Sequence, residues 1–359
     1  MKILFYFTSM TPAGGIERVI STLANHFSDF LEVTILVKDQ AYSHYPLSEK
    51  IKLISLDSEL KLNMGSRTKR IGQVSINLVQ SVAKLKHHLT LNKYDLYYLA
   101  HPLNVLEFFL AHGINKNVII SEHGGINAYN LIYKQIKKWL YHKARVYIVP
   151  TRSDAKVYAD LNFPVKYIPH FKSSLNYECS DLSKKVVLSI GRMTEAKRQW
   201  IMIDLWHKII YEDNIKNWEL HLVGDGNLKK QFEGKIVALE LQDYVKILPP
   251  IKNVDKYYKA SSIFMLTSHS EGFGMVLLEA ISFGLPCISY DCPSGPRDII
   301  ENEVNGYLVP MDDFDHLRDA TLSLLTDPEK LNKFATGAYN TSLKWNDEVV
   351  LNKWKEILF

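Results

Sequence analysis

Two short segments of this chain combine charged side chains with glycine-containing turns. The first, residues 189–198, places Arg192 and Lys197 after an apolar stretch. The second, residues 270–279, sets a Gly-Phe-Gly turn between two glutamates. Two cations and the free N–H groups at a helix start suit a diphosphate. Carboxylates accept hydrogen bonds from the hydroxyls of a sugar or a ribose. These residue types predict a site for a nucleotide diphosphate sugar.

Other candidate residues follow predicted strands in the same way. The Gly14-Gly15 turn lets backbone approach an anion closely. His123 lies between an apolar run and a second Gly-Gly pair, where it can donate to a sugar hydroxyl or to developing charge. A tight turn and a capping histidine are the ordinary structural alternatives. Ligands of open parallel sheets bind where strands end, and that shared location favours the functional interpretation. The acidic pair Asp313 and Asp315 follows no predicted strand, and we interpret it as chance.

The elements that must position these residues alternate between strand and helix. Continuous apolar runs predict strands at 3–7, 32–37, 94–100, 117–121 and 145–150, and then at 185–190, 220–223, 245–248, 263–267 and 286–290. Helical spacing predicts helices at 16–27, 67–90 and 131–143. On the second of these, the predicted apolar face consists of Ile71, Val74, Leu78, Val82, Leu85 and Leu89. Such a βαβ rhythm predicts parallel sheets covered by helices. It restarts near Pro169, which predicts two doubly wound domains joined by a hinge at 166–175.

Bulk composition supports two domains and excludes several classes of protein. A chain of 359 residues is larger than most single cores. Three cysteines without a CxxC pair predict neither a disulfide framework nor a zinc site, and indicate a reducing compartment. The first residues read as a strand, not as a signal peptide, and no apolar run approaches a membrane span. The absence of GxGxxG argues against a dinucleotide oxidoreductase.

Charge is distributed unevenly along the chain. Residues 1–170 hold 21 Lys and Arg against 12 Asp and Glu, a net charge of +9, and the remainder holds 22 against 27, a net charge of −5. Between Leu60 and Tyr94 there is no acidic residue. The first half should therefore favour an anionic partner, although a solvated helix face is an equally good interpretation. No motif of aromatic and basic residues supports nucleic-acid binding.

Taken in order, the motifs resemble those of the family 4 retaining glycosyltransferases of the GT-B fold. The matching segments are Gly-Gly-Ile-Glu at 14–17, Ser-Glu-His at 121–123, Gly-Arg to Lys at 191–197, Gly-Asp-Gly at 224–226, and Glu-Gly-Phe-Gly to Glu at 271–279. The run at 290–296 looks like that of bacterial members that build capsule, exopolysaccharide, O-antigen or lipid-linked glycans. One departure is Lys197-Arg198, where many relatives have Lys-Gly.

The resemblance implies an architecture. Residues 1–168 would form an acceptor-binding Rossmann-like domain and residues 169–341 a nucleotide-sugar-binding one. Residues 342–359 would form a C-terminal helix that packs back on the first domain, and the site would lie in the interdomain cleft.

The resemblance also implies a role for each matching residue. Arg192 and Lys197 would hold the donor diphosphate. Glu271 would bind the hydroxyls of the donor sugar, and Glu279 those of the ribose. His123 would lie beside the reacting centre, so that His123, Glu271, Arg192 and Lys197 form the catalytic group. The other donor-binding residues would be Gly15, Gly224, Gly272, Phe273, Gly274 and Met275.

The implied reaction moves a hexose or N-acetylhexosamine (Gal, GalNAc, Glc or GlcNAc) from a UDP-sugar to a glycan acceptor with retention of configuration. We expect no cofactor and no metal, since the two cations would stabilise the departing diphosphate. A GDP-mannose-type mannosyltransferase and an inert GT-B partner subunit are the alternatives, and a sugar-nucleotide epimerase is a more distant one.

The basic first half gains a meaning from the same resemblance. A lipid-linked acceptor would place the enzyme on the anionic inner face of the cell membrane, so we expect a cytoplasmic, peripherally associated protein that binds no nucleic acid. The 131–145 region would contribute, together with six cationic residues: Lys61, Arg67, Lys69, Arg70, Lys84 and Lys86.

Overall fold

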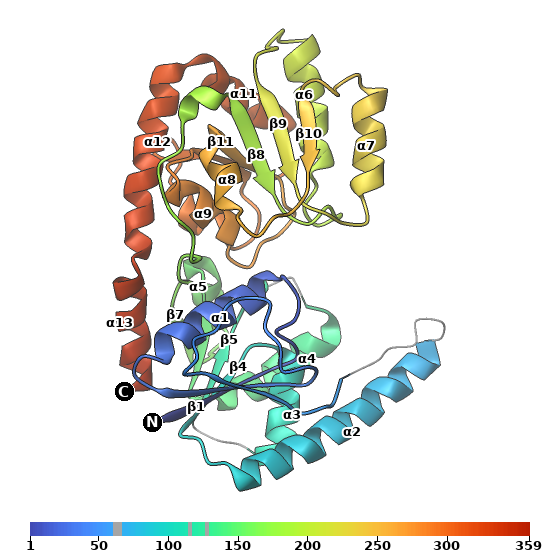
Figure 1. The fold of residues 1–359 in the computed structure, drawn as a ribbon, viewed down its shortest axis with the longest axis vertical. Helices are drawn as coiled ribbons and strands as arrows, with labels where there is room; N and C mark the ends of the chain where they lie inside the picture. The colour runs from blue at the N-terminus through green and yellow to red at the C-terminus, as the bar shows by residue number, and fades with distance from the viewer. Residues whose placement is uncertain (60–66, 114–116, 126–128) are drawn as a thin grey trace. The chain divides into compact units, whose positions relative to one another are not determined.

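A computed structural model describes residues 1–59, 67–113, 117–125 and 129–359 (Figure 1). These residues divide into two compact units. The first unit takes the described residues within 1–124, 129–171 and 351–359, and the second takes Gly125 and 172–350. The chain passes from one unit to the other between Phe171 and Lys172, inside the segment predicted as a hinge.

The first unit is built on a seven-stranded parallel sheet with the strand order β3-β2-β1-β4-β5-β6-β7. Its strands are β1 (Lys2–Phe7), β2 (Glu32–Val37), β3 (Lys52–Ser55), β4 (Leu96–Leu99), β5 (Val118–Ser121), β6 (Val146–Val149) and β7 (Val165–Tyr167). Strand order reverses between β1 and β4. In an open parallel sheet, this switch point is where the loops part and a ligand can enter.

Helices of the first unit follow β1, β3, β4, β5 and β6, whereas β2 leads to β3 without an intervening helix (Figure 1). They are α1 (Gly15–Phe27), α2 (Arg67–Leu91), α3 (Pro102–His112), α4 (Leu131–Leu140) and α5 (Arg152–Asp160). The helix predicted at 16–27 is confirmed, and its Val19, Ile20, Leu23, Ala24 and Phe27 are buried, whereas Ile16 is half-buried.

The apolar face predicted for α2 is wrong in part. The structure buries Asn77 and Ser81 in line with Leu85 and Leu89, whereas Val74 is exposed. Asn77 is drawn inward because its side chain accepts a hydrogen bond from Lys38 Nζ (2.9 Å) and donates one to the Ser58 carbonyl (2.8 Å). Polar pairing therefore overrides hydrophobic periodicity on this helix. Leu78 and Val82 are half-buried, and the Ile71 side chain lies outside the described residues.

The second unit contains a six-stranded parallel sheet with the order β10-β9-β8-β11-β12-β13. Its strands are β8 (Val186–Ile190), β9 (Glu219–Val223), β10 (Val245–Leu248), β11 (Ile263–Leu266), β12 (Cys287–Tyr290) and β13 (Gly306–Val309). Its helices are α6 (Trp200–Tyr211), α7 (Lys229–Ala238), α8 (Asp255–Lys259), α9 (Met275–Ser282), α10 (Pro296–Ile299), α11 (Phe314–Thr326) and α12 (Pro328–Ser342). The switch point lies between β8 and β11.

Successive side chains along these strands enter two different cores. Val187 and Ile263 belong to one cluster, whereas their neighbours Leu188 and Phe264 belong to the other. Alternation of this kind places an apolar layer on each face of the sheet, which is why the strands read as continuous apolar runs.

The chain ends in α13 (Asp347–Leu358), whose residues from Leu351 onward belong to the first unit. Trp354 packs edge-on against Phe27 with 5.5 Å between ring centroids, and its ring lies 6.2 Å from that of Tyr98. The predicted C-terminal helix thus begins at Asp347 rather than at Ser342, after a short 3₁₀ turn at Leu343–Trp345.

Candidate functional site

The loop after β8 is held by backbone contacts that fix Arg192 and Lys197. Met193 is fully buried, and its N–H donates to the Asp225 carbonyl (2.8 Å). Lys197 closes a turn by donating its N–H to Thr194, and the Thr267 hydroxyl at the end of β11 donates to the Lys197 carbonyl. The loop is therefore anchored on both neighbours of β8, and the Arg192 side chain is exposed.

Gly224 and Gly226 are explained by packing against this loop. A Cβ at Gly224 would lie 2.0 Å from the Gly191 carbonyl oxygen, and one at Gly226 would lie 2.3 Å from that of Met193. Both distances are impossible for real side chains. The glycines let the β9 loop approach the Arg192 loop closely, whereas the donor-binding role of Gly224 stays a prediction.

The central contact of the second unit joins the two predicted motifs. Lys197 Nζ lies 2.6 Å from Glu271 Oε1, and the two side chains are 24% and 10% exposed. These residues are 74 positions apart and meet because β8 and β11 are neighbours at the switch point. A cation suits the phosphates of a sugar diphosphate and a carboxylate suits its sugar hydroxyls, and both groups lie here at the carboxyl ends of neighbouring strands.

A helix N-terminus begins beside this pair. Gly274 is the N-cap of α9 with φ 88°, a left-handed conformation that favours glycine, and it makes no side-chain cap. Phe273 is buried, whereas Gly272 and Met275 are partly exposed. The first N–H groups of a helix have no acceptor within the helix itself. They can bind an anion, and the helix dipole favours negative charge there.

Glu279 lies inside the second unit and is only 1% exposed. Its carboxylate accepts hydrogen bonds from the Ser173 hydroxyl and from Tyr258 OH, the latter at 2.7 Å. A carboxylate offers about four acceptor sites. Two of these sites are used by hydrogen bonds within the second unit, which gives Glu279 a structural role there. Its contact with a ribose stays a prediction.

Arg198 occupies a position where many relatives have glycine, and its backbone conformation explains why glycine is suited to it. Its φ of 53° lies in the left-handed region. The residue is not merely solvent-facing, since its guanidinium pairs with Asp312 and lies over the Tyr290 ring, 5.8 Å from the centroid. The local loop conformation is the one that a glycine adopts without strain.

His123 lies on the loop after β5 in the first unit. Its Nε2 is 3.2 Å from Tyr98 OH, and its ring stacks on that of His170 with centroids 5.3 Å apart. Burial lowers the pKa of His123 to about 4, against the opposing effect of Glu122. The ring is therefore neutral near pH 7. Its Nδ1 is shielded from solvent and has no hydrogen-bond partner among the described residues.

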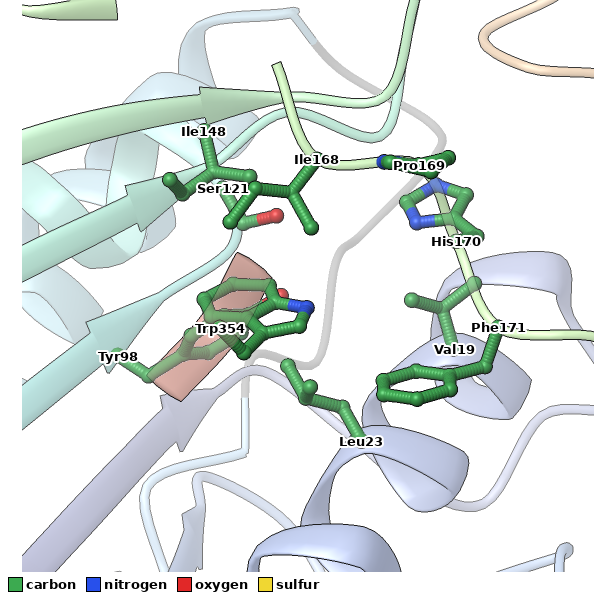
Figure 2. Close-up of a pocket in the computed structure, with 10 residues that line it drawn as sticks. All are labelled: Val19, Leu23, Tyr98, Ser121, Ile148, Ile168, Pro169, His170, Phe171 and Trp354. Carbon is green, nitrogen blue, oxygen red and sulfur yellow. The ribbon is translucent and has the colours of Figure 1, made fainter. Parts of the chain in front are cut away.

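A small pocket lies behind His170 (Figure 2). Trp354, Leu23 and Val19 contribute apolar walls, and Tyr98 lies beside them. Its volume of about 10 Å³ holds at most one water molecule. This pocket has no room for a sugar, and His123 is not among the residues that line it.

Gly15 opens α1, and Gly14 is its N-cap. A Cβ built on Gly15 would meet no atom within 4 Å, which leaves open space beside this turn. A Cβ on Gly14 would lie 2.1 Å from a Glu17 carboxylate oxygen. The Glu17 side chain is flexible and can move aside, so this contact does not require glycine at position 14, whereas the open space beside Gly15 is accessible to a ligand.

Other sequence candidates have local structural roles. Asp313 is the N-cap of α11 and accepts the His316 N–H (3.0 Å), so half of the acidic pair has a capping function. Arg297 forms a two-pronged pair with Asp291 (2.9 and 2.8 Å) and closes the loop after β12.

The predicted cationic surface is only partly described. Lys84 and Lys86 are exposed on α2, and Lys84 Nζ donates to the Asp57 carbonyl (2.6 Å). Lys61 lies outside the described residues, as do the side chains of Arg67, Lys69 and Arg70. No helix in the described ranges combines the length and the apolar character needed to cross a bilayer.

Sequence reasoning missed a buried ion pair next to His123. Lys137, which we expected on the basic surface of α4, is buried and contacts the Glu122 carboxylate. That expectation is wrong because four tyrosine rings and a carboxylate surround the ammonium. The one available signal was that Glu122 directly precedes His123.

Comparison with known proteins agrees with this architecture. Residues 13–171 match the family model "Glycosyltransferase Family 4", and residues 178–341 match "Glycosyl transferases group 1". The chain is 28% identical to the amylovoran biosynthesis glycosyltransferase AmsD of Erwinia amylovora, over 99% of both chains. It is 27% identical to an α-1,4-N-acetyl-D-galactosaminyltransferase of Campylobacter jejuni, over 87% of this chain and 86% of the relative. The crystal structure of HepE from Anabaena superposes with a TM-score of 0.79 at 21% identity, covering 100% and 99% of the two chains.

Two parallel, doubly wound units define the GT-B class of fold, as expected from the sequence. The two family models together account for nearly all of the chain. The protein therefore belongs to the glycosyltransferases that combine these two domains.

Proposed function

We propose that this protein is a retaining glycosyltransferase that moves a hexose or N-acetylhexosamine from a UDP-sugar to a glycan acceptor. The observation that supports it best is the Lys197–Glu271 contact beside the start of α9. Lys197 and Arg192 would hold the diphosphate, and Glu271 would accept hydrogen bonds from the sugar. UDP is favoured over GDP because HepE was crystallised with UDP and glucose.

The proposed reaction needs no covalent nucleophile. The bond from the anomeric carbon to the diphosphate breaks, and a bond to the acceptor hydroxyl forms on the same face. The hydroxyl proton passes to the leaving phosphate oxygen. Catalysis then consists of charge stabilisation by Arg192, Lys197 and the α9 N–H groups, which is the role that a metal ion plays elsewhere. We propose that transfer proceeds without a divalent metal, so that EDTA leaves the rate unchanged.

The neutral His123 ring would act at the donor sugar. An imidazole that carries no charge at neutral pH can donate or accept one hydrogen bond at each nitrogen. Its Nε2 is engaged with Tyr98 and its Nδ1 is shielded from solvent, so the ring would reach a sugar hydroxyl only after a local rearrangement that exposes Nδ1. His123 thereby supplies orientation rather than positive charge.

The acceptor would be a lipid-linked glycan in bacterial surface polysaccharide synthesis. The name of the Campylobacter relative specifies an undecaprenyl-diphosphate-linked acceptor, and AmsD is named for amylovoran synthesis. On this chain α4 exposes Leu131 (79%), Ile132 (70%) and Trp139 (65%), and it contains no acidic residue. Exposed apolar and aromatic side chains beside Lys134 and Lys138 suit the interface of an anionic membrane.

Thermal shift against a panel of UDP- and GDP-sugars tests the proposal. A ligand at a hundredfold excess over its Kd stabilises the folded state by about 2.7 kcal/mol. We expect one UDP-sugar to raise the melting temperature, and Arg192→Ala to abolish the rise. A response to GDP-mannose alone would identify a mannosyltransferase instead. Binding without any donor hydrolysis or transfer would indicate an inert partner subunit.

A further inference from the structure

The Glu122 carboxylate accepts hydrogen bonds from the backbone of the loop that carries His123. Oε1 accepts the N–H of His123 and the N–H of Gly124, both at 3.1 Å. One side chain thereby fixes the orientation of two successive peptide groups immediately after β5. The Glu122 N–H in turn donates to the Ile148 carbonyl on β6 (2.8 Å), so the backbone of Glu122 is anchored to the sheet.

Three further donors hold the carboxylate inside the first unit. Tyr129 OH donates to Oε1 (2.8 Å), and Lys137 and Tyr147 donate to Oε2. Lys137 also donates to Tyr158 OH at 2.6 Å. Burial acts to raise the pKa of Glu122, but Lys137 and the hydroxyl donors outweigh it and lower that pKa overall. Both partners are therefore charged although they are 2% and 6% exposed.

A buried ion pair is costly to desolvate, and apolar side chains of similar volume often stabilise a protein as well or better. Stability alone therefore does not explain why Glu122 and Lys137 form a buried ion pair. The first unit contains a second buried pair, Lys38–Glu107, with similar burial. The Glu107 carboxylate binds side chains, namely those of Tyr6, Asn104 and Lys38. Glu122 differs because it binds the backbone of the His123 loop.

We infer that Glu122 and Lys137 are positioning residues, which connect α4 to the His123 loop and hold the imidazole in the orientation needed at the donor sugar. The inference rests on the proposed function only where it takes His123 to face that sugar. A displacement of about 1 Å at a reacting group is enough to cost roughly 10²-fold in rate.

The test compares two double variants. Glu122→Met with Lys137→Met removes both charges of the first pair together with the acceptor for the His123 and Gly124 N–H groups, and Lys38→Met with Glu107→Met removes both charges of the second. The readouts are the ¹⁵N signals of His123, assigned by their loss in His123→Gln, and kcat and KM with the sugar nucleotide found by thermal shift. Removing both charges avoids an unpaired buried ion, which would unfold a single variant.

We expect the Glu122/Lys137 variant to shift the His123 ring signals and to lower kcat by about 10- to 100-fold, with the donor KM and the UDP-induced thermal shift retained. The Lys38/Glu107 variant should keep the wild-type His123 signals and kcat per folded molecule. The inference is overturned if the first variant keeps the wild-type signals, or if both variants change them equally. If the wild-type chain turns over no sugar nucleotide, the proposed function fails, and the His123 signals alone decide the positioning role.

Discussion

Replacing Glu271 by glutamine should separate the affinity for UDP from the affinity for the sugar attached to it. The side chain keeps its shape but loses its charge. In the structure that charge lies 2.6 Å from Lys197 Nζ, where a diphosphate is proposed to bind. The carboxylate therefore repels the phosphates while it attracts the sugar hydroxyls, and the substitution acts on the two ligands in opposite directions.

Coulomb's law gives the expected change in the affinity for UDP. Two unit charges about 6 Å apart interact by roughly 3 kcal/mol at an effective dielectric constant near 20. Physiological salt, with a screening length of about 8 Å, reduces this by roughly half. UDP should thus bind about tenfold more tightly to Glu271→Gln. A charged acceptor makes a hydrogen bond about twice as strong as a neutral one, so each hydroxyl contact loses about 1 kcal/mol.

Calorimetric titration of UDP and of the UDP-sugar measures both effects. We expect the UDP-sugar to lose its advantage over UDP by about tenfold, while its own affinity changes little because the two effects offset each other. Glu195→Gln is the matched control, since it removes one negative charge from an exposed side chain of the neighbouring loop, which carries Lys197. Lys197→Met should weaken both ligands by about 1.5–3 kcal/mol. Equal weakening of UDP and UDP-sugar in Glu271→Gln would refute the assignment of Glu271 to the sugar.

Three further predictions follow from single features of the structure. Because Arg198 has a φ of 53°, Arg198→Gly should be about 0.5–1 kcal/mol more stable than Arg198→Ala in urea unfolding; the reverse order would mean that this conformation carries no strain. Burial lowers the pKa of His123 from 6.5 to about 4, so unfolding takes up a proton between these values. The free energy of unfolding should fall as pH drops through this window, and a fall of equal slope in His123→Gln would contradict the assignment. Leu131→Ser with Trp139→Ser should reduce cosedimentation with anionic vesicles, whereas Leu110→Ser, which removes an exposed leucine from α3, should not.

Much of the fold could be predicted because the central strands are buried on both faces. β1, for example, has five successive buried residues, and no half-exposed strand produces such a run. The strands that were missed, β3, β7 and β13, all lie at sheet edges. They have three or four residues, and partly exposed side chains interrupt their apolar pattern. The fourth edge strand, β10, was predicted because apolar residues occupy three of its four positions.

In the candidate site, too, some features could be predicted from the sequence and others could not. The location of Arg192, Lys197 and Glu271 after strands was predictable, because the topology of a doubly wound sheet brings the ends of β8 and β11 together, whereas their donor-binding roles stay predictions. The Lys197–Glu271 contact itself joins residues 74 positions apart, and no spacing rule contains it. Asn77 faces inward for a comparable reason, since its partners are contributed by distant segments.

Helix α4 shows most clearly why the remainder was not predictable. Lys134, Lys137 and Lys138 look equivalent in the sequence, yet Lys137 is buried against Glu122 while the other two are exposed. A lysine enters a core only where a carboxylate and hydroxyl donors compensate its desolvation, and that compensation is a tertiary property. The consequence is that one helix has two chemically different faces. Its inner face pairs Lys137 with the Glu122 carboxylate that accepts the His123 N–H, and its outer face exposes Leu131, Ile132 and Trp139. Charge counts along a segment therefore overstate a basic surface wherever one of its cations has a buried partner.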